Sequence, residues 1–146
     1  MRFVRIVAVA AMVTGFAGTA SAQEAVIKLR QALMEVNQQS AGLAVNMIRE
    51  QIPYDAQQLA TAMLAISQSS HLFPTLFPDG SNVAPSKATP ALWENRSDFE
   101  SIAAKMVADA AAAAEAAAQG PEAFRAAFGD VGDNCQTCHE KYRQEN

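Results

Sequence analysis

Cys135-Gln136-Thr137-Cys138-His139, close to the C-terminal end of the chain, has the spacing Cys-x-x-Cys-His. In a helix, residues at positions i, i+3 and i+4 share one face, so the two thiols and the imidazole project in the same direction. Thiols at this spacing can form thioethers with the two vinyl groups of a haem, and the adjacent imidazole can bind its iron. The motif therefore predicts one covalently attached haem c, held by Cys135 and Cys138, with His139 as an axial iron ligand.

Other uses of a Cys-x-x-Cys pair fit the surrounding sequence less well. A thioredoxin-like redox pair requires a βαβ context, and the chain shows no alternating strand pattern. A zinc site requires more ligands, but the chain has only two cysteines and one further histidine, His71. A disulfide between residues three apart on a helix has poor geometry. Haem attachment is therefore favoured, and His71 is expected to be a surface or loop residue.

Apolar residues recur at helical spacing in four segments of the chain, and the motif lies in the last of them. The segments expected to be helical are 24–51, 55–70, 89–119 and 121–143, ended by Pro53, by the breaks in 71–89 and by Gly120-Pro121. Asp55 is expected to cap the second helix, and Thr89-Pro90 to open the third. The expected inward-facing residues are Val26, Leu29, Leu33, Val36, Leu43 and Met47; Leu59, Met63 and Ile66; Trp93, Phe99, Ile102, Met106 and Ala110; and Phe124, Phe128, Val131, Cys135, Cys138 and Tyr142.

Two short turns and one long crossover between helices two and three predict an all-α fold, an antiparallel four-helix bundle with a cofactor between facing helices. The crossover carries Leu72, Phe73, Leu76 and Phe77, so it is expected to pack against the bundle or the haem. Two glycines in the last helix, at 129 and 132, indicate either close approach of the haem or a neighbouring helix, or a local kink.

The N-terminal region has the features of a secretory signal peptide. Arg2 and Arg5 precede a mostly apolar segment, and Ala20-Ser21-Ala22 forms an A-x-A cleavage site. The apolar segment is too short and too rich in Ala and Gly to favour a membrane anchor. We therefore expect residues 1–22 to be removed, leaving residues 23–146 as one exported domain.

The charge of the chain argues against two classes of partner. Its formal net charge is −4, and loss of two arginines with the signal peptide makes it more negative. An acidic chain without a basic cluster is a poor candidate for binding nucleic acid or an anionic membrane. The acids are scattered and no Ser, Cys and His arrangement suggests a hydrolase, so an enzyme is not expected.

Several stretches resemble the class II c-type cytochromes, the cytochrome c′ family. The haem motif lies on the last of four helices, as it does in that family. The other stretches that carry the resemblance are Leu29-Arg30-Gln31-Ala32-Leu33-Met34, Pro53-Tyr54-Asp55-Ala56, Pro90-Ala91-Leu92-Trp93, Ala126-Ala127-Phe128-Gly129-Asp130-Val131-Gly132 and the ending Tyr142-Arg143. The resemblance covers essentially all of residues 23–146.

The resemblance assigns roles to residues that contact the haem. It implies thioether links at Cys135 and Cys138, a proximal His139, a distal-face Met34, a propionate-binding Arg30, a haem-flanking Phe77 and a basic Arg143 beside the proximal histidine. Some of these have other interpretations from the residues alone. Met34 is either a sixth iron ligand or a core filler beside an open site. Arg30 is otherwise a surface arginine, Phe77 and Trp93 ordinary core residues, and Arg143 a cap for the last helix carbonyls.

The family resemblance implies a periplasmic protein that carries single electrons by cycling haem iron between Fe(II) and Fe(III). The alternative is a five-coordinate haem protein that binds nitric oxide or carbon monoxide, for sensing or scavenging. Redox partner proteins and a homodimer through the first two helices are the expected partners, without nucleic acid or membrane. A peroxidase-like enzyme is disfavoured because no distal histidine or arginine is evident.

Overall fold

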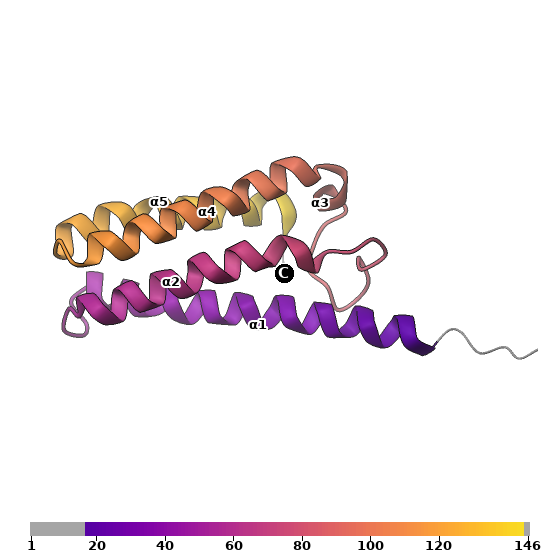
Figure 1. Ribbon diagram of the computed structural model, residues 1–146, viewed down its shortest axis with the longest axis horizontal. Helices are drawn as coiled ribbons and strands as arrows, with labels where there is room; N and C mark the ends of the chain where they lie inside the picture. The colour runs from indigo at the N-terminus through magenta and orange to yellow at the C-terminus, as the bar shows by residue number, and fades with distance from the viewer. Residues whose placement is uncertain (1–16, 145–146) are drawn as a thin grey trace, which may run out of the picture.

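Four long helices form where the apolar spacing predicts them. The computed structural model describes residues 17–144, and its long helices are α1 (Ala17–Ile48), α2 (Ala56–Leu72), α4 (Arg96–Ala117) and α5 (Pro121–Tyr142). A 3-10 helix, η1 (Phe73–Leu76), and a single turn, α3 (Ala91–Glu94), lie in the crossover between α2 and α4. The predicted antiparallel four-helix bundle is confirmed (Figure 1). Within residues 17–144, no helix has the length and apolar character needed to cross a bilayer.

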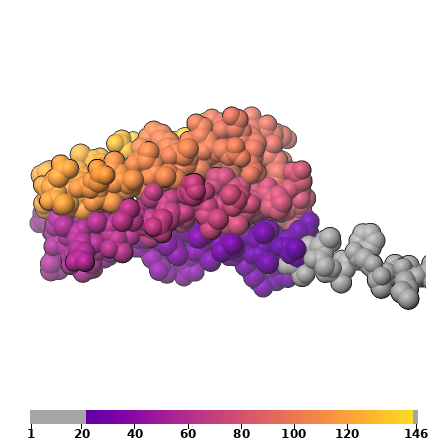
Figure 2. All heavy atoms as spheres, in the orientation of Figure 1, coloured from indigo at the N-terminus to yellow at the C-terminus, as the bar shows by residue number. Residues whose placement is uncertain are grey.

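The four long helices make three extensive interfaces and one sparse one. α1 packs along α2, α2 along α4, and α4 along α5, whereas α1 and α5 contact each other at few points. Figure 2 shows the atoms of α4 pressed against those of α2 along the length of the bundle, with α1 on the other side of α2. Buried alanines of α4, at positions 110, 113, 114 and 117, allow α4 to approach both neighbours closely. The seam between α1 and α5 is therefore the one that packing closes least.

Local hydrogen bonds explain where the helices begin and end. The predicted N-cap Asp55 is confirmed, because its carboxylate accepts from the Gln58 backbone N–H at 2.9 Å. α1 ends three residues earlier than predicted, at Ile48, because Glu50 adopts a left-handed conformation (φ 58°) and the chain turns. The predicted signal peptide lies mostly outside the described residues, and its cleavage point after Ala22 falls within α1.

The third predicted helix is broken, which corrects the expectation of one helix over 89–119. α3 ends at Glu94 and α4 begins at Arg96, because Asn95 leaves the helical region (φ −120°, ψ 44°). Thr89 is not the N-cap, since Pro90 occupies that position without a side-chain cap. The Thr89 hydroxyl instead donates to the Lys141 carbonyl at 3.4 Å, which ties the crossover to α5.

The buried apolar residues form two clusters at different levels of the bundle. The main cluster, toward the short interhelical connections, consists of Ala44, Met47, Leu59, Ala62, Met63, Ile66, Met106, Ala110, Ala113, Ala114, Ala117, Phe124 and Val131. The aromatic cluster, toward the crossover, consists of Leu76, Phe77, Leu92, Phe99 and Tyr142, with Leu33, Phe73, Trp93, Ile102 and Cys138 packed against it. Most predicted inward-facing residues of the last three helices belong to these clusters or pack against them, and the crossover packs on the bundle as predicted.

The predicted inward stripe of the first helix is partly wrong. Leu29 and Val36 are each 41% exposed, and the buried residues of α1 include Ile27 and Arg30 instead. Because Arg30 is buried, the alternative that it is a surface arginine is wrong. In the crossover, Leu72 is also exposed, although its neighbours Leu76 and Phe77 are buried.

The glycines at 129 and 132 do not mark close approach of a neighbouring helix. Both are exposed within the continuous α5, and a methyl group added to either would meet no atom of residues 17–144 within 4 Å. Of the alternatives left open for these glycines, close approach of a neighbouring helix is therefore wrong, and close approach of the haem stays a prediction.

Candidate haem site

The Cys-x-x-Cys-His motif lies on α5 where the burial of that helix is interrupted. Val131 and Tyr142 are 1% and 5% exposed, whereas Cys135 and Cys138, which lie between them on the inward face, are only half-buried. Cys135 packs against the main cluster and Cys138 against the aromatic cluster. The two thiols therefore bridge the levels of the two clusters, on the helix that contacts α1 least.

On the side of α1 that faces α5, burial is interrupted at the same level of the bundle. Leu33 packs against the aromatic cluster, as Cys138 does, and Ala41 against the main cluster, as Cys135 does. Met34, between these levels, is half-buried. The structure therefore brings Met34 to the same level of the bundle as the two cysteines, across the sparse α1–α5 seam.

The two cysteines are free thiols whose surroundings suit neither redox nor zinc chemistry. Burial raises the pKa of both thiols, that of Cys138 to about 11, so both are protonated at neutral pH. A catalytic or metal-binding cysteine instead has a lowered pKa. Residues 17–144 also contain no group of three His, Cys, Asp or Glu side chains placed to hold a metal ion.

The surroundings of His139 favour the neutral imidazole that iron ligation requires. The residue is largely exposed, but the part of its ring that is covered and the positive charge of Arg143 both lower its pKa. The Arg143 backbone N–H donates to the His139 carbonyl at 3.1 Å. Arg143 therefore caps the helix through its backbone N–H, while the charge of its side chain helps to lower the pKa of the His139 imidazole.

The end of α5 that carries the motif is anchored to α4 and to the crossover. The Tyr142 hydroxyl donates to Asp98 at 2.6 Å, and the Lys141 ammonium lies 2.9 Å from the same carboxylate. The Tyr142 carbonyl accepts from the Thr89 N–H at 3.0 Å, and a one-residue bridge joins Ala88 to Arg143. These contacts fix the position of the last turn, where His139 lies.

We expect both tyrosines to ionise at a higher pH than a tyrosine side chain in water. Burial, the hydrogen bond to Asp98 and the charge of that carboxylate raise the pKa of Tyr142 to about 12, and burial raises that of Tyr54. Because the folded state holds the Tyr142 proton more tightly, this stabilisation is complete below pH 10 and is lost between about pH 10 and about pH 12. Ultraviolet titration of the wild type and of Tyr142→Phe and Tyr54→Phe measures each ionisation. Ionisation of both phenols at pH 10 in the folded protein would contradict this assignment.

Arg30 is a buried cation that lacks a carboxylate partner among the described residues. It is 5% exposed, and burial lowers its pKa to about 10, so it remains charged at neutral pH. Its guanidinium donates to the Leu76 carbonyl at 2.7 Å, to the carbonyl and hydroxyl of Ser81 and to the Ser86 hydroxyl, and lies 4.0 Å from the centre of the Phe77 ring. All of these acceptors are neutral, so an anion placed nearby would be strongly favoured.

Arg96, which the sequence did not single out, holds the crossover from the opposite side. Its guanidinium donates to the Pro74 carbonyl at 2.6 Å and to the Phe77 carbonyl at 3.0 Å, and pairs with Glu100 at 2.7 Å. Phe77 is thus held through its ring by Arg30 and through its backbone by Arg96. The structure therefore brings Arg30, Phe77 and Cys138 together around the aromatic cluster.

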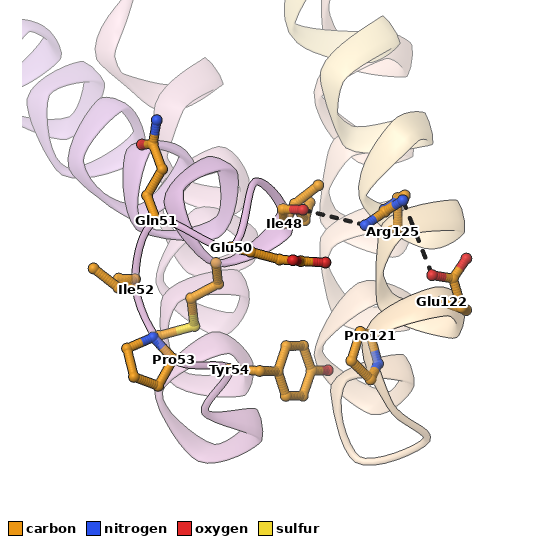
Figure 3. Close-up of a pocket in the computed structure, with 10 residues that line it drawn as sticks. Ile48, Glu50, Gln51, Ile52, Pro53, Tyr54, Pro121, Glu122 and Arg125 are labelled. Atoms are coloured by element: carbon orange, nitrogen blue, oxygen red, sulfur yellow. Dashed lines mark hydrogen bonds and ion pairs between the residues drawn. The ribbon is translucent and has the colours of Figure 1, made fainter.

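A cavity lies at the other end of the bundle from this site, near the short connections between the helices. It has a volume of about 550 Å³ and is lined by the α1–α2 connection and the start of α5. Figure 3 shows Arg125 in this cavity, between the Ile48 carbonyl, at 3.2 Å, and Glu122, at 3.9 Å. None of the predicted site residues lines this cavity. His71 is exposed at the end of α2, as predicted.

Comparisons with known proteins agree with the motif and the fold. The family model described as Cytochrome C' matches residues 25–143. Cytochrome c-556 of Agrobacterium tumefaciens (strain II Chrys) is 36% identical over 117 residues, which cover 80% of this chain and 95% of that protein. Cytochrome c' of Rhodopseudomonas palustris is 30% identical over 140 residues, which cover 95% of each chain.

A solved structure extends the likeness to three dimensions. A nitric oxide complex of a cytochrome c prime mutant from Alcaligenes xylosoxidans superposes with a TM-score of 0.76 at 28% identity, covering 84% of this chain and 97% of that one.

Proposed function

Because the chain belongs to the cytochrome c′ family and carries one covalently bound c-type haem, we propose that it transfers single electrons in the periplasm. The observation that carries this proposal is the arrangement around the α1–α5 seam. Cys135, Cys138 and His139 share one face of α5, and Met34 of α1 lies at the same level. The haem supplies one-electron cycling between Fe(II) and Fe(III) when bound there.

The residues of the site have separate tasks in this proposal. Cys135 and Cys138 hold the haem covalently, and His139 is the proximal ligand to its iron. The main and aromatic clusters lie at the two levels that flank the haem motif and limit the access of water there, which strengthens charge interactions. Phe77, held by two arginines, supplies a fixed aromatic wall.

Arg30 is proposed to bind a haem propionate. Its buried guanidinium is charged, and among residues 17–144 it has only neutral partners. A carboxylate offers paired hydrogen bonds to a guanidinium and removes the cost of an unpaired buried charge. Arg143, exposed beside His139, is proposed to tune the electrostatics at the proximal side.

A second candidate function is the binding of small gases at an open distal face. The observation that favours it is the nitric oxide complex of the similar Alcaligenes xylosoxidans protein. Met34 separates the two candidates, because its thioether either occupies the sixth coordination position of the iron or packs beside a free one.

Optical spectra with and without carbon monoxide distinguish the two functions. For an electron carrier closed by Met34, we expect sharp low-spin bands in the reduced protein that carbon monoxide does not change. The Met34→Ala variant is then expected to become high-spin and to bind carbon monoxide. A wild-type spectrum that is already high-spin and shifts with carbon monoxide supports gas binding instead. Identical spin state and ligand binding in the wild type and in Met34→Ala would contradict any role for Met34 at the iron.

We propose a homodimer through α1 and α2. Exposed apolar side chains lie on both helices, namely Leu29 and Val36 of α1 (41% each) and Leu64 and Leu72 of α2 (47% and 43%). Leu29 and Val36 are seven residues apart and so lie nearly in line. The mass in solution by light scattering is expected to be that of two chains, and that of one chain for Val36→Glu.

We propose that the protein is exported and that it is not an enzyme. The predicted signal peptide over 1–22 supports export to the periplasm, where redox partner proteins would exchange electrons with the haem. N-terminal sequencing of the purified protein, with Gln23 as the expected first residue, tests the cleavage.

A further inference from the structure

Asn37 is a polar side chain on the inward face of α1. Because residues seven apart lie almost in line along a helix, Arg30, Asn37 and Ala44 form one row. Arg30 and Ala44 are 5% and 0% exposed, whereas Asn37, between them, is only half-buried. The row therefore faces inward but is incompletely covered at its middle, one helical turn from Met34 and at the level of the two cysteines.

The hydrogen bonds of Asn37 leave a donor unused. A carboxamide has two N–H donors and one carbonyl oxygen. Among residues 17–144, the amide of Asn37 has one partner, the hydroxyl of the buried Ser69 on α2, which also lies 3.0 Å from the Ile66 carbonyl. Whether this hydroxyl donates to the amide oxygen or accepts from the amide nitrogen, at least one Asn37 N–H has no partner among these residues. Ser69 thus orients the amide without exhausting its donors.

Two residues one turn from Asn37 on α1 are apolar and pack into the bundle. Leu33 and Ala41, one turn away on either side, pack against the aromatic cluster and the main cluster. In such surroundings an oriented N–H interacts strongly with a partial negative charge, because little water competes for it. A single amide at this position is therefore able to discriminate between ligands by polarity.

We propose that Asn37 donates a hydrogen bond to a small ligand bound to the haem iron on the α1 side. The bond would favour ligands whose outer atom carries partial negative charge, such as nitric oxide, over less polar ones, such as carbon monoxide. This inference rests on the proposed haem site between α1 and α5.

Infrared spectroscopy of the haem-loaded protein tests the inference. The Met34→Ala variant is the background, because loss of the thioether opens the α1 side whether or not Met34 binds the iron. Its ferrous carbon monoxide and nitric oxide complexes are compared with those of Met34→Ala/Asn37→Leu. A hydrogen bond to the outer atom lowers the C–O and N–O stretching frequencies, so both are expected to rise in the double variant. Nitric oxide dissociation is expected to become roughly 3- to 10-fold faster, the factor that one hydrogen bond supplies.

Two further variants separate this role from a structural one. Asn46→Leu, an exposed position on the same helix, is expected to leave both stretching frequencies unchanged. Ser69→Ala, which releases the amide orientation, is expected to broaden both bands and to serve as the deciding variant if Asn37→Leu does not fold. Unchanged bands in Asn37→Leu, or in Ser69→Ala where it is the deciding variant, would overturn the role of Asn37 but not the proposed haem site. Failure of Met34→Ala to bind carbon monoxide would instead overturn the proposed distal site on the α1 side.

Discussion

Replacing Cys135 and Cys138 together by alanine is expected to abolish covalent haem attachment. These are the only cysteines in the sequence, so no other thiol can form a thioether. Each single variant is expected to keep one thioether. Extraction with acidified acetone, followed by intact mass measurement, checks this: the haem should leave the double variant completely and stay with the wild type.

One of the two residues between the cysteines provides the matched control. Thr137 is exposed, and its hydroxyl donates only to the Asp133 carbonyl of its own helix, at 2.9 Å. Thr137→Ala therefore keeps both thiols and the helix, and is expected to retain haem fully. Covalent haem in the double cysteine variant, or its loss from Thr137→Ala, would show that the attachment site is assigned wrongly.

The fold was largely predictable because helix signals in this chain are local. Asp55 caps α2 through a hydrogen bond within one turn, and the apolar spacing of α2 and α5 matches their buried faces. The errors arose where tertiary contacts override local preference. Asn95 breaks the third helix, and Leu29 and Val36 of α1 are exposed although their apolar spacing assigns them to the inward face.

The candidate site was predictable only where its residues are close in sequence. The Cys-x-x-Cys-His spacing gives three groups on one helical face directly. The partners of Arg30 and Arg96 are backbone carbonyls of the crossover, which have no side-chain signature, so Arg96 gave no signal. Asn37 gave a weak sequence signal, because it lies seven residues after Arg30 and so on the same helix face. Its pairing with Ser69 on α2 depends on how the helices pack.

Phe99→Ala is expected to be the most destabilising single substitution in the aromatic cluster. Phe99 is 1% exposed, and its ring lies 5.2 Å from Phe77, 5.5 Å from Tyr142 and 6.3 Å from Phe73, measured between ring centres. Removing a fully buried phenylalanine costs about 3–5 kcal/mol. Denaturant unfolding of the haem-loaded protein, followed by circular dichroism, measures the change in the free energy of unfolding.

The effect of Phe99→Ala should reach the haem site because the ring joins the crossover to the end of α5. Phe77 is also fixed by Arg30 and Arg96. Tyr142 is the last residue of α5, and its side chain is held by Asp98 and the Phe99 ring. We therefore expect loosening at Tyr142, next to His139, and a Tyr142 ionisation closer to pH 10. Ile52→Ala, at a position 37% exposed in the α1–α2 connection, is the control and should cost less than about 1 kcal/mol. Equal destabilisation by the two variants would show that the aromatic cluster does not hold the crossover against α5.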